Sequence, residues 1–373
     1  MTIPLSAPDI TEAEIAAVTA VLRTPHLSLG PELGAFEAAL AAYHDVPHVV
    51  AVSSGTAGLH LALLTLGIGE GDDVILPSFT FIAVANAVLQ VRATPVLVEI
   101  EPDTLNLDPE AVERAITART RAVVVVHTFG VPAEMDALEA VARRHGLSII
   151  EDACEAIGAE YGGRRVGTFG SLAVLGFYPN KQMTTGEGGA VLTRDTEHAA
   201  RLRSLRNQGR RAGGDWLDHA EPGYNSRLSE LACALGRVQL GRIGEMLELR
   251  RAAAARYQRL LSEAGIDGLE LPPLSRPSRV ISWFVYVVRL PRGVDRDRIR
   301  EGLAARGIQS GRYFAPIHLQ AAWVKFSGST VPTFPITESI ASRTLALPFF
   351  NRIQENEQEQ VAEALKAAIR DAE

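Results

Sequence analysis

The sequence predicts an α/β protein, in which a large three-layer α/β/α domain with a mostly parallel sheet is followed by a smaller C-terminal α+β domain. Between about residues 46 and 195, short apolar runs rich in β-branched residues alternate with helical segments. Such continuously apolar runs are typical of strands that helices cover on both faces. After about residue 240 the alternation stops. We therefore expect the two domains to comprise residues 1–244 and 245–373.

The expected elements of the larger domain follow one another as strand, helix and strand. The strands are expected at 46–54, 72–78, 94–100, 121–130, 147–153, 172–177 and 190–193, and the helices at 57–67, 83–91, 108–118 and 135–146. Repeated units of this kind imply parallel strands joined by right-handed crossovers. Because ligands of such sheets bind beyond the carboxyl ends of the strands, polar residues at those ends are the candidate functional residues.

The smaller domain is expected to begin with a long amphipathic helix. Its elements are the helix 241–265, the proline-rich connector 271–277, the strand 282–291 and the helices 295–306 and 355–372. The strand alternates in the manner of a half-exposed antiparallel strand. The first 35 residues are expected to pack against one of the two domains.

Composition and charge exclude several classes of protein. Acidic residues outnumber basic ones by 44 to 37, and no stripe of arginine and lysine stands out, so we expect no nucleic-acid partner. The two cysteines, Cys154 and Cys233, cannot form a disulfide framework, which favours a reducing compartment. Because the sequence shows neither a signal-peptide pattern nor an apolar run as long as a membrane span, we expect a cytoplasmic protein without a membrane partner.

Three polar motifs follow strands of the larger domain. Residues 53–58 (SSGTAG) suit a phosphate, although by themselves they are more typical of a capped helix with a tight turn. Glu151 and Asp152 end a buried strand, where a carboxylate either points to the ligand crevice or serves a cap or an ion pair. Lys181 lies in a glycine-rich segment between two buried strands, and lysine is scarce in this sequence, which has only two others, Lys325 and Lys366.

Together these motifs supply what a pyridoxal 5′-phosphate enzyme needs. A cradle binds the phosphate, a carboxylate at 151 or 152 keeps the pyridine nitrogen protonated, and a lysine forms a Schiff base and then moves protons. No glycine fingerprint opens the first strand–helix unit, which argues against a dinucleotide-dependent dehydrogenase. We assign no metal site.

The sequence resembles the DegT/StrS family of pyridoxal phosphate-dependent nucleotide-sugar aminotransferases, which have the aspartate aminotransferase fold, fold type I. The resemblance runs from LSLGPELGAFE (27–37) to RTLALPFF (343–350). Its most specific stretches are SSGTAGLHLAL (53–63), PSFTFIAVANAV (77–88), IIEDACEAIGAEYGGRRVGTFG (149–170), FYPNKQMTTGEGG (177–189), GYNSRLSELACALGRVQL (223–240) and APIHLQ (315–320).

The resemblance implies a role for five residues around the cofactor. Lys181 matches the lysine that binds pyridoxal phosphate covalently, and Asp152 matches the partner of the pyridine nitrogen. Gly55 and Thr56 match the phosphate cradle, and Phe81 matches the aromatic residue that stacks on the ring.

The resemblance also implies roles for three further residues, at the substrate or at a second chain. Asn225 resembles the residue that reaches the phosphate of the other subunit, which implies a homodimer with shared active sites, although a turn asparagine often serves only its own loop. Tyr313 and His318 lie in a segment that lines the sugar pocket in relatives, and ordinary packing explains them equally well.

Two positions depart from the family pattern. Gly176 stands where many relatives have a serine that binds the phosphate, and Glu155 stands where many have glutamine or histidine. A carboxylate near the phenolic oxygen of the cofactor repels it unless the carboxylate is protonated or paired. Three interpretations of Glu155 stay open: a protonated carboxyl, an arginine partner and a role toward the substrate.

The resemblance implies transfer of an amino group from L-glutamate to a keto-sugar nucleotide, in the biosynthesis of amino sugars. Three alternatives are a sugar dehydratase, an aminotransferase for a cyclitol or another ketone, and a non-catalytic regulator of the same fold. Dehydratases of the family replace the lysine with histidine, so Lys181 argues against the first. The presence of both Lys181 and Asp152 argues against the regulator.

Overall fold

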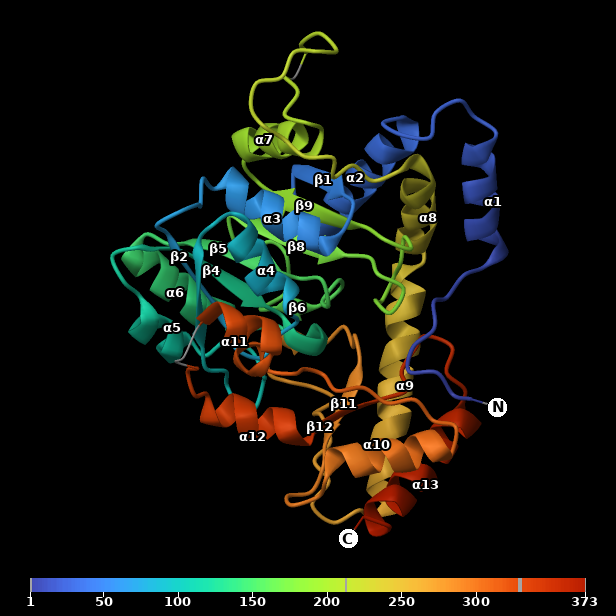
Figure 1. The fold of residues 1–373 in the computed structure, drawn as a ribbon. Coiled ribbons are helices and arrows are strands. Elements are labelled where there is room, and N and C mark those ends of the chain that lie inside the picture. The colour runs from blue at the N-terminus through green and yellow to red at the C-terminus, as the bar shows by residue number, and fades with distance from the viewer. Residues whose placement is uncertain (1, 212, 328–330, 373) are drawn as a thin grey trace.

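A computed structural model describes residues 2–211, 213–327 and 331–372 (Figure 1). Its central sheet has seven strands in the order β1-β9-β8-β5-β4-β2-β3. These strands are β1 (His48–Val52), β2 (Asp73–Pro77), β3 (Thr94–Val98), β4 (Thr120–Val126), β5 (Ser148–Asp152), β8 (Leu172–Gly176) and β9 (Gly189–Thr193). The pairs from β8 to β3 are parallel, whereas β9 is antiparallel to both β1 and β8. The prediction of a mostly parallel sheet is confirmed.

Helices cover both faces of this sheet, so the larger part of the chain has three layers (Figure 1). One face is covered by α3 (Gly55–Thr65), α4 (Ala83–Gln90) and α7 (Thr196–Arg206), and the other by α2 (Pro31–His44), α5 (Pro109–Ala115), α6 (Met135–His145) and α8 (Glu230–Gly241). The period of two in a strand divides the side chains between the faces. In β1, Val50 and Val52 join the core under α3, and Val49 and Ala51 join the core under α2.

The C-terminal part packs around a core of its own, except that Trp323 is buried in the core under α3. It contains α9 (Ile243–Ala264), α10 (Arg296–Ala305), α11 (Ala321–Ser327), α12 (Pro335–Arg343), α13 (Glu355–Arg370) and the antiparallel pair β11 (Tyr286–Arg289) and β12 (Thr344–Leu347). A third, small sheet consists of β6 (Glu160–Tyr161), β7 (Arg164–Arg165) and β10 (Arg279–Val280). None of the helices in the described ranges combines the length and the apolar character that crossing a membrane requires.

The N-terminal residues contact both cores rather than one, which corrects the expectation. Ile3 is buried in the C-terminal core with α9 and α13, whereas Leu33 in α2 is buried in the core of the larger part. Between them, α1 (Glu12–Leu22) packs along α8. The division of the chain at residues 244 and 245 stays a prediction.

Most strands are shorter than predicted, and in β4 and β11 the difference shapes the site. β4 ends at Val126 because Phe129 and Gly130 take left-handed conformations, with φ of 60° and 84°. The strand expected from residue 282 begins only at Tyr286, because Trp283 has a φ of 54° and interrupts the extended backbone. β11 is also not half-exposed as predicted, since side chains from it enter two different buried clusters.

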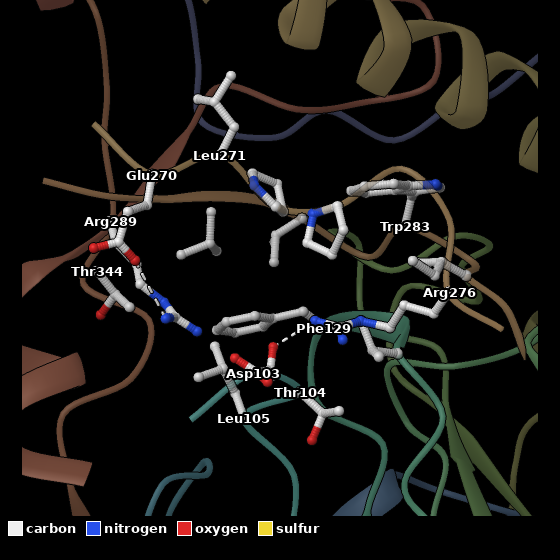
Figure 2. A pocket seen from close by; sticks show the side chains of 16 residues that line it. Asp103, Thr104, Leu105, Phe129, Glu270, Leu271, Arg276, Trp283, Arg289 and Thr344 are labelled. Carbon is white, nitrogen blue, oxygen red and sulfur yellow. Dashed lines mark hydrogen bonds and ion pairs between the residues drawn. The ribbon is translucent and has the colours of Figure 1, made fainter. Parts of the chain in front are cut away.

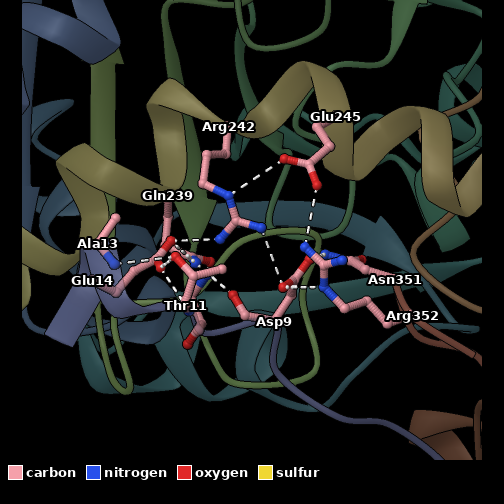
Figure 3. Close-up of polar contacts among 10 residues, drawn as sticks. Asp9, Thr11, Ala13, Glu14, Gln239, Arg242, Glu245, Asn351 and Arg352 are labelled. Carbon is pink, nitrogen blue, oxygen red and sulfur yellow. Dashed lines mark hydrogen bonds and ion pairs between the residues drawn. The ribbon is translucent and has the colours of Figure 1, made fainter.

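A buried charge cluster joins the N-terminal segment to the junction of α8 and α9 (Figure 3). Arg242, at that junction, donates to Glu14 at 2.7 Å and to Asp9 at 3.2 Å, and Arg352 donates to Asp9 at 2.8 Å. Burial by itself raises the pKa of Glu14, but hydrogen bonds from Thr11 and Arg242 outweigh it and lower that pKa to about 2. The cluster therefore stabilises the fold only while its carboxylates are ionised.

We predict that Glu14→Gln destabilises the protein at neutral pH by on the order of 1–3 kcal/mol, because it removes one of the two buried carboxylates that pair with Arg242. A folded pKa below the ordinary value of 4.5 gives stability that is present above that pH and is lost as the pH falls toward about 2. The urea midpoint of the variant should therefore approach that of the wild type across this range. Glu12→Gln, on the exposed side of α1, is the control. A pH-independent difference would contradict the prediction.

Candidate active site

A cavity of about 550 Å³ lies at the carboxyl ends of the central strands. Val126, Asp152 and Gly176, the last residues of β4, β5 and β8, all border it. Seven of the predicted site residues line this cavity: Gly55, Thr56, Phe81, Asp152, Glu155, Lys181 and Tyr313. Asn225 and His318 are not part of its lining.

The link between β1 and α3 forms an anion cradle at one end of the cavity. The Ser54 hydroxyl caps α3 by accepting the Ala57 N–H at 3.0 Å, so the helix begins at Gly55. The first N–H groups of a helix have no acceptor within it, and the helix dipole adds positive charge there. A Cβ at position 55 would lie 2.7 Å from the sulfur of Cys154, so only glycine fits. The capped helix and the phosphate cradle are thus one structure, and the cradle fits the phosphate of pyridoxal phosphate.

Neighbouring carboxylates at the end of β5 serve opposite faces of the sheet. Glu151 is fully buried, lies 3.2 Å from His127 Nε2 and accepts backbone N–H groups of the segment 167–170. Burial by itself raises the pKa of Glu151, but the bond from His127 and those N–H groups outweigh it and lower the pKa. Asp152 instead borders the cavity and accepts the Cys154 N–H at 3.0 Å. Of the two, Asp152 is therefore the residue that can bind a ring nitrogen.

Lys181 and Glu155 form the charged pair of the cavity. The Lys181 Nζ lies 3.4 Å from Glu155 Oε1 and 3.9 Å from the ring centroid of Phe284. The other carboxylate oxygen accepts the Phe129 N–H at 3.0 Å. Burial raises the pKa of Glu155, and the charge of Lys181 opposes that rise. Among the described residues the cation beside Glu155 is this lysine and not an arginine.

Gly176 ends β8 directly opposite Cys154. A Cβ at position 176 would lie 3.1 Å from both Cβ and Sγ of Cys154, which is tighter than ordinary contact. The cysteine thus fills the space that a serine at 176 would use. This packing gives the departure at Gly176 a physical reason.

Asn225 and His318 lie outside the cavity of their own chain. Asn225 is exposed, and its neighbour Ser226 accepts the Ser53 N–H at 2.9 Å, beside the cradle. His318 is fully buried, with Nε2 3.2 Å from Glu338 Oε1. Burial lowers the pKa of His318, and the bond to Glu338 opposes it. Within its own chain His318 is therefore a packed interior residue and does not line the cavity.

Tyr313 lines the cavity, and its ring is stacked on Phe284 with an interplanar angle of 11°. Sequence reasoning missed Phe284 and Cys154. Cys154 follows Asp152 by two residues and was open to inference, whereas nothing near Phe284 in the sequence connects it with Lys181.

A second cavity, of about 300 Å³, is lined by Phe129 and Trp283 among other residues (Figure 2). Its charged groups bind one another or the backbone: Arg289 pairs with Glu270 at 3.4 Å, and Arg276 donates to the carbonyl of Asp103. None of the predicted site residues lines it. The first cavity is therefore the candidate active site.

A cradle for an anion, a carboxylate at a strand end and a buried lysine around one cavity are the arrangement of a pyridoxal phosphate-dependent enzyme. The chain matches the profile of the DegT/DnrJ/EryC1/StrS aminotransferase family over residues 8–366, and it belongs to this family. It is a pyridoxal phosphate-dependent sugar aminotransferase, and the predicted family, fold and cofactor are confirmed.

Two curated relatives cover nearly the whole chain. The chain is 44% identical to dTDP-3-amino-3,4,6-trideoxy-alpha-D-glucose transaminase of Streptomyces venezuelae, over 94% of this chain and 90% of that protein. It is 41% identical to the erythromycin biosynthesis sensory transduction protein EryC1 of Saccharopolyspora erythraea, over 91% and 90%.

Solved structures share the fold. DesV of S. venezuelae in complex with a ketimine intermediate has a TM-score of 0.89 and 42% identity, and 98% of each chain is covered. The PLP form of the putative sugar aminotransferase Spr1654 from Streptococcus pneumoniae has a TM-score of 0.94 and 27% identity, with both chains covered completely.

We predict that Gly176→Ser alone weakens binding of pyridoxal phosphate by roughly 1–2 kcal/mol, because the new side chain crowds Cys154 beside the cradle. Cys154→Ala/Gly176→Ser should recover most of that loss, because it removes the sulfur from the same space. The dissociation constant of the cofactor, titrated by absorbance into stripped protein, is the measurement.

The matched control is Cys233→Ala/Gly176→Ser, which removes a buried thiol in α8 away from the cavity and should recover nothing. Strictly additive effects of Cys154→Ala and Gly176→Ser would show that the two positions do not share this space.

Proposed function

We propose that this aminotransferase moves an amino group from L-glutamate to a keto-sugar nucleotide, as a cytoplasmic homodimer with shared active sites. The observation that carries the proposal is the pairing of Lys181 with Glu155 in a cavity that also holds the cradle and Asp152. The relative at 44% identity is named as the transaminase of a dTDP sugar, which supports a nucleotide sugar as substrate. Two free cysteines support a reducing compartment.

The residues that hold the cofactor have separate tasks. Pyridoxal phosphate supplies an aldehyde that condenses with amines and a ring that accepts the electrons released at the substrate carbon. The N–H groups of Gly55 and Thr56 bind its phosphate at the start of α3. The carboxylate of Asp152 keeps the ring nitrogen protonated, and Phe81 offers an aromatic face at the cavity.

Lys181 and Glu155 handle the proton. The amine of Lys181 takes a proton from the donor substrate in one half of the reaction and returns one to the acceptor substrate in the other. At 3.4 Å, Glu155 is close enough to balance the charge of a protonated Lys181. Burial raises the pKa of Glu155, and the nearby charge of Lys181 opposes that rise. The carboxylate thus compensates the charge that Lys181 gains when it accepts a proton.

Exposed apolar side chains, at the cavity and on the segment after α7, support a second chain. Phe81 is 60% exposed at the cavity, and Trp216 and Leu217 are 69% and 79% exposed on the segment that extends from the end of α7 (Figure 1). Asn225 lies further along the same segment and does not line the cavity of its own chain. Groups of this kind are suited to contact with a partner chain.

The test of the function is a panel of keto-sugar nucleotides with L-glutamate, read by mass spectrometry for the aminated product. Borohydride reduction of the holoenzyme should place the cofactor label on Lys181 and on neither Lys325 nor Lys366. Lys181→Ala should lower turnover by at least roughly a thousandfold while the protein stays folded. A regulator of the same fold, which the name of the second relative favours, would give no aminated product with any ketone.

The shared site makes a separate prediction, read by mixing two inactive chains. Lys181→Ala and Asn225→Ala homodimers should each be impaired, but after subunit exchange one site of every heterodimer carries neither lesion. For random exchange, about a quarter of the wild-type activity should return. If each chain completes its own site, mixing restores nothing. A monomer at the assay concentration would also refute the shared site.

A further inference from the structure

Arg250 is a fully buried cation at the centre of α9. Its side chain is 1% exposed, and its guanidinium donates to three backbone carbonyl groups. Nη2 donates to Lys181 O at 3.0 Å, and Nη1 donates to Trp283 O at 3.1 Å and to Phe284 O at 2.9 Å. The same group therefore binds the backbone of the catalytic lysine and the backbone of the aromatic residue beneath its amine.

These bonds close a ring of contacts around the cavity. The Phe284 N–H donates to Phe129 O at 3.2 Å, and the Phe129 N–H donates to Glu155 at 3.0 Å. Glu155 then pairs with Lys181 at 3.4 Å, and the ring of Phe284 lies 3.9 Å from the lysine nitrogen. Each residue in this closed ring of contacts is thus held by two of the others.

A second bridge runs parallel to Arg250. The side-chain amide of Gln182 donates to Glu155 O at 2.6 Å and to Ser282 Oγ at 2.9 Å. Like Arg250, Gln182 joins the segment 181–182 to the segment 282–284, but it does so next to Glu155. Removal of Arg250 therefore loosens the ring without detaching these segments from one another.

A charge at this position is costly for stability alone. A buried cation without a carboxylate partner is unfavourable, and carbonyl dipoles compensate it only in part. Burial lowers the pKa of Arg250 to about 9, so the guanidinium is still charged at neutral pH. Among the described residues no carboxylate forms an ion pair with it, and its guanidinium carbon lies 5.5 Å from the centroid of the Phe349 ring.

The place of Arg250 on its helix is also informative. Ile243 and Met246 of α9 belong to the core of the larger part, whereas Ala253 and Tyr257 belong to the C-terminal core. Arg250 lies between these two groups, at the point where α9 passes from one core to the other. The backbone that it holds at Trp283 has a φ of 54°, a conformation that a large side chain adopts only when the surroundings enforce it.

We propose that Arg250 is a positioning residue, which fixes the Lys181 amine between Glu155 and the ring of Phe284 by holding the backbone of Lys181 and Phe284 together. The proposal rests on the proposed role of Lys181. It implies that the C-terminal core, through α9, sets the geometry of the proton-transferring amine.

The test compares Arg250→Gln and Arg250→Lys with Arg256→Lys. Arg256 lies on the same helix and donates to Gln358 and to Ile353 O, away from the cavity. In cofactor-free protein at a fixed pH, acetylation of each lysine is followed by peptide mass spectrometry. Lys325 and Lys366, both exposed, serve as internal standards. The holoenzymes give kcat and KM for both substrates, and thermal unfolding gives stability.

We expect Arg250→Gln to raise the acetylation of Lys181 relative to Lys325 about threefold or more, because the amine is no longer held against Glu155. The kcat should fall roughly 10- to 100-fold with KM nearly unchanged, because the amine is misplaced but the substrate site is intact. Arg250→Lys retains a cation and should recover part of both effects. Arg256→Lys should change neither the acetylation ratio nor kcat, whatever its effect on stability.

A wild-type acetylation ratio in Arg250→Gln, or an equal change in Arg256→Lys, overturns the proposal. If Arg250→Gln does not fold, the ratio in Arg250→Lys decides in the same way. The acetylation needs no cofactor, so it is independent of the proposed function. A raised ratio in a protein that forms no borohydride label on Lys181 would retain the positioning role and refute the catalytic one.

Discussion

A guanidinium group that water cannot reach must find its hydrogen-bond acceptors inside the protein, and this constraint organises the active site. The three carbonyl groups that Arg250 binds belong to segments about 100 residues apart in the sequence. Because they converge on one rigid planar donor, the loop after β8 and the segment before β11 cannot move independently. The turn after β4 and Glu155 are joined to the same ring. The backbone of Lys181 is therefore held by hydrogen bonds to other segments and is not part of a freely moving loop.

Because a buried charge needs a partner, the adjacent carboxylates Glu151 and Asp152 have different uses. A strand sends successive side chains to opposite faces, so Glu151 and Asp152 cannot share an environment. Glu151 is stabilised by hydrogen bonds with His127 and with backbone N–H groups, and it fixes the turn at 167–170. Asp152 is left at the cavity, where a protonated ring nitrogen is a suitable partner. A further carboxylate, Glu155, is stabilised there by Lys181 beside it and by the Phe129 N–H.

Gly176 offers the cavity no hydroxyl donor, and Cys154 gives this departure from the family pattern a steric reason. The sulfur of Cys154 occupies the space beside Gly176 and also excludes any side chain at Gly55. The two glycines and the cysteine are thus one packing unit. The remaining donors, the N–H groups at the start of α3, belong to the backbone and do not depend on the side chain at 176.

The sequence by itself determined the parallel sheet and the order of the helices, and it predicted a phosphate cradle, Asp152 and Lys181 at strand ends that border one cavity in the structure. These features have local causes: continuous apolar runs, caps, glycines and polar residues at strand ends, all within a few residues of one another. Only the tertiary structure decided that β11 is buried on both faces, that His318 binds Glu338 rather than facing the cavity, and that Phe284 lies beneath Lys181. It also decided that Arg250, which in the sequence is one of several arginines on an amphipathic helix, binds the backbone carbonyl groups of Lys181 and Phe284. Such contacts join residues far apart in the chain, so no local pattern records them, and they exist only once both cores are packed.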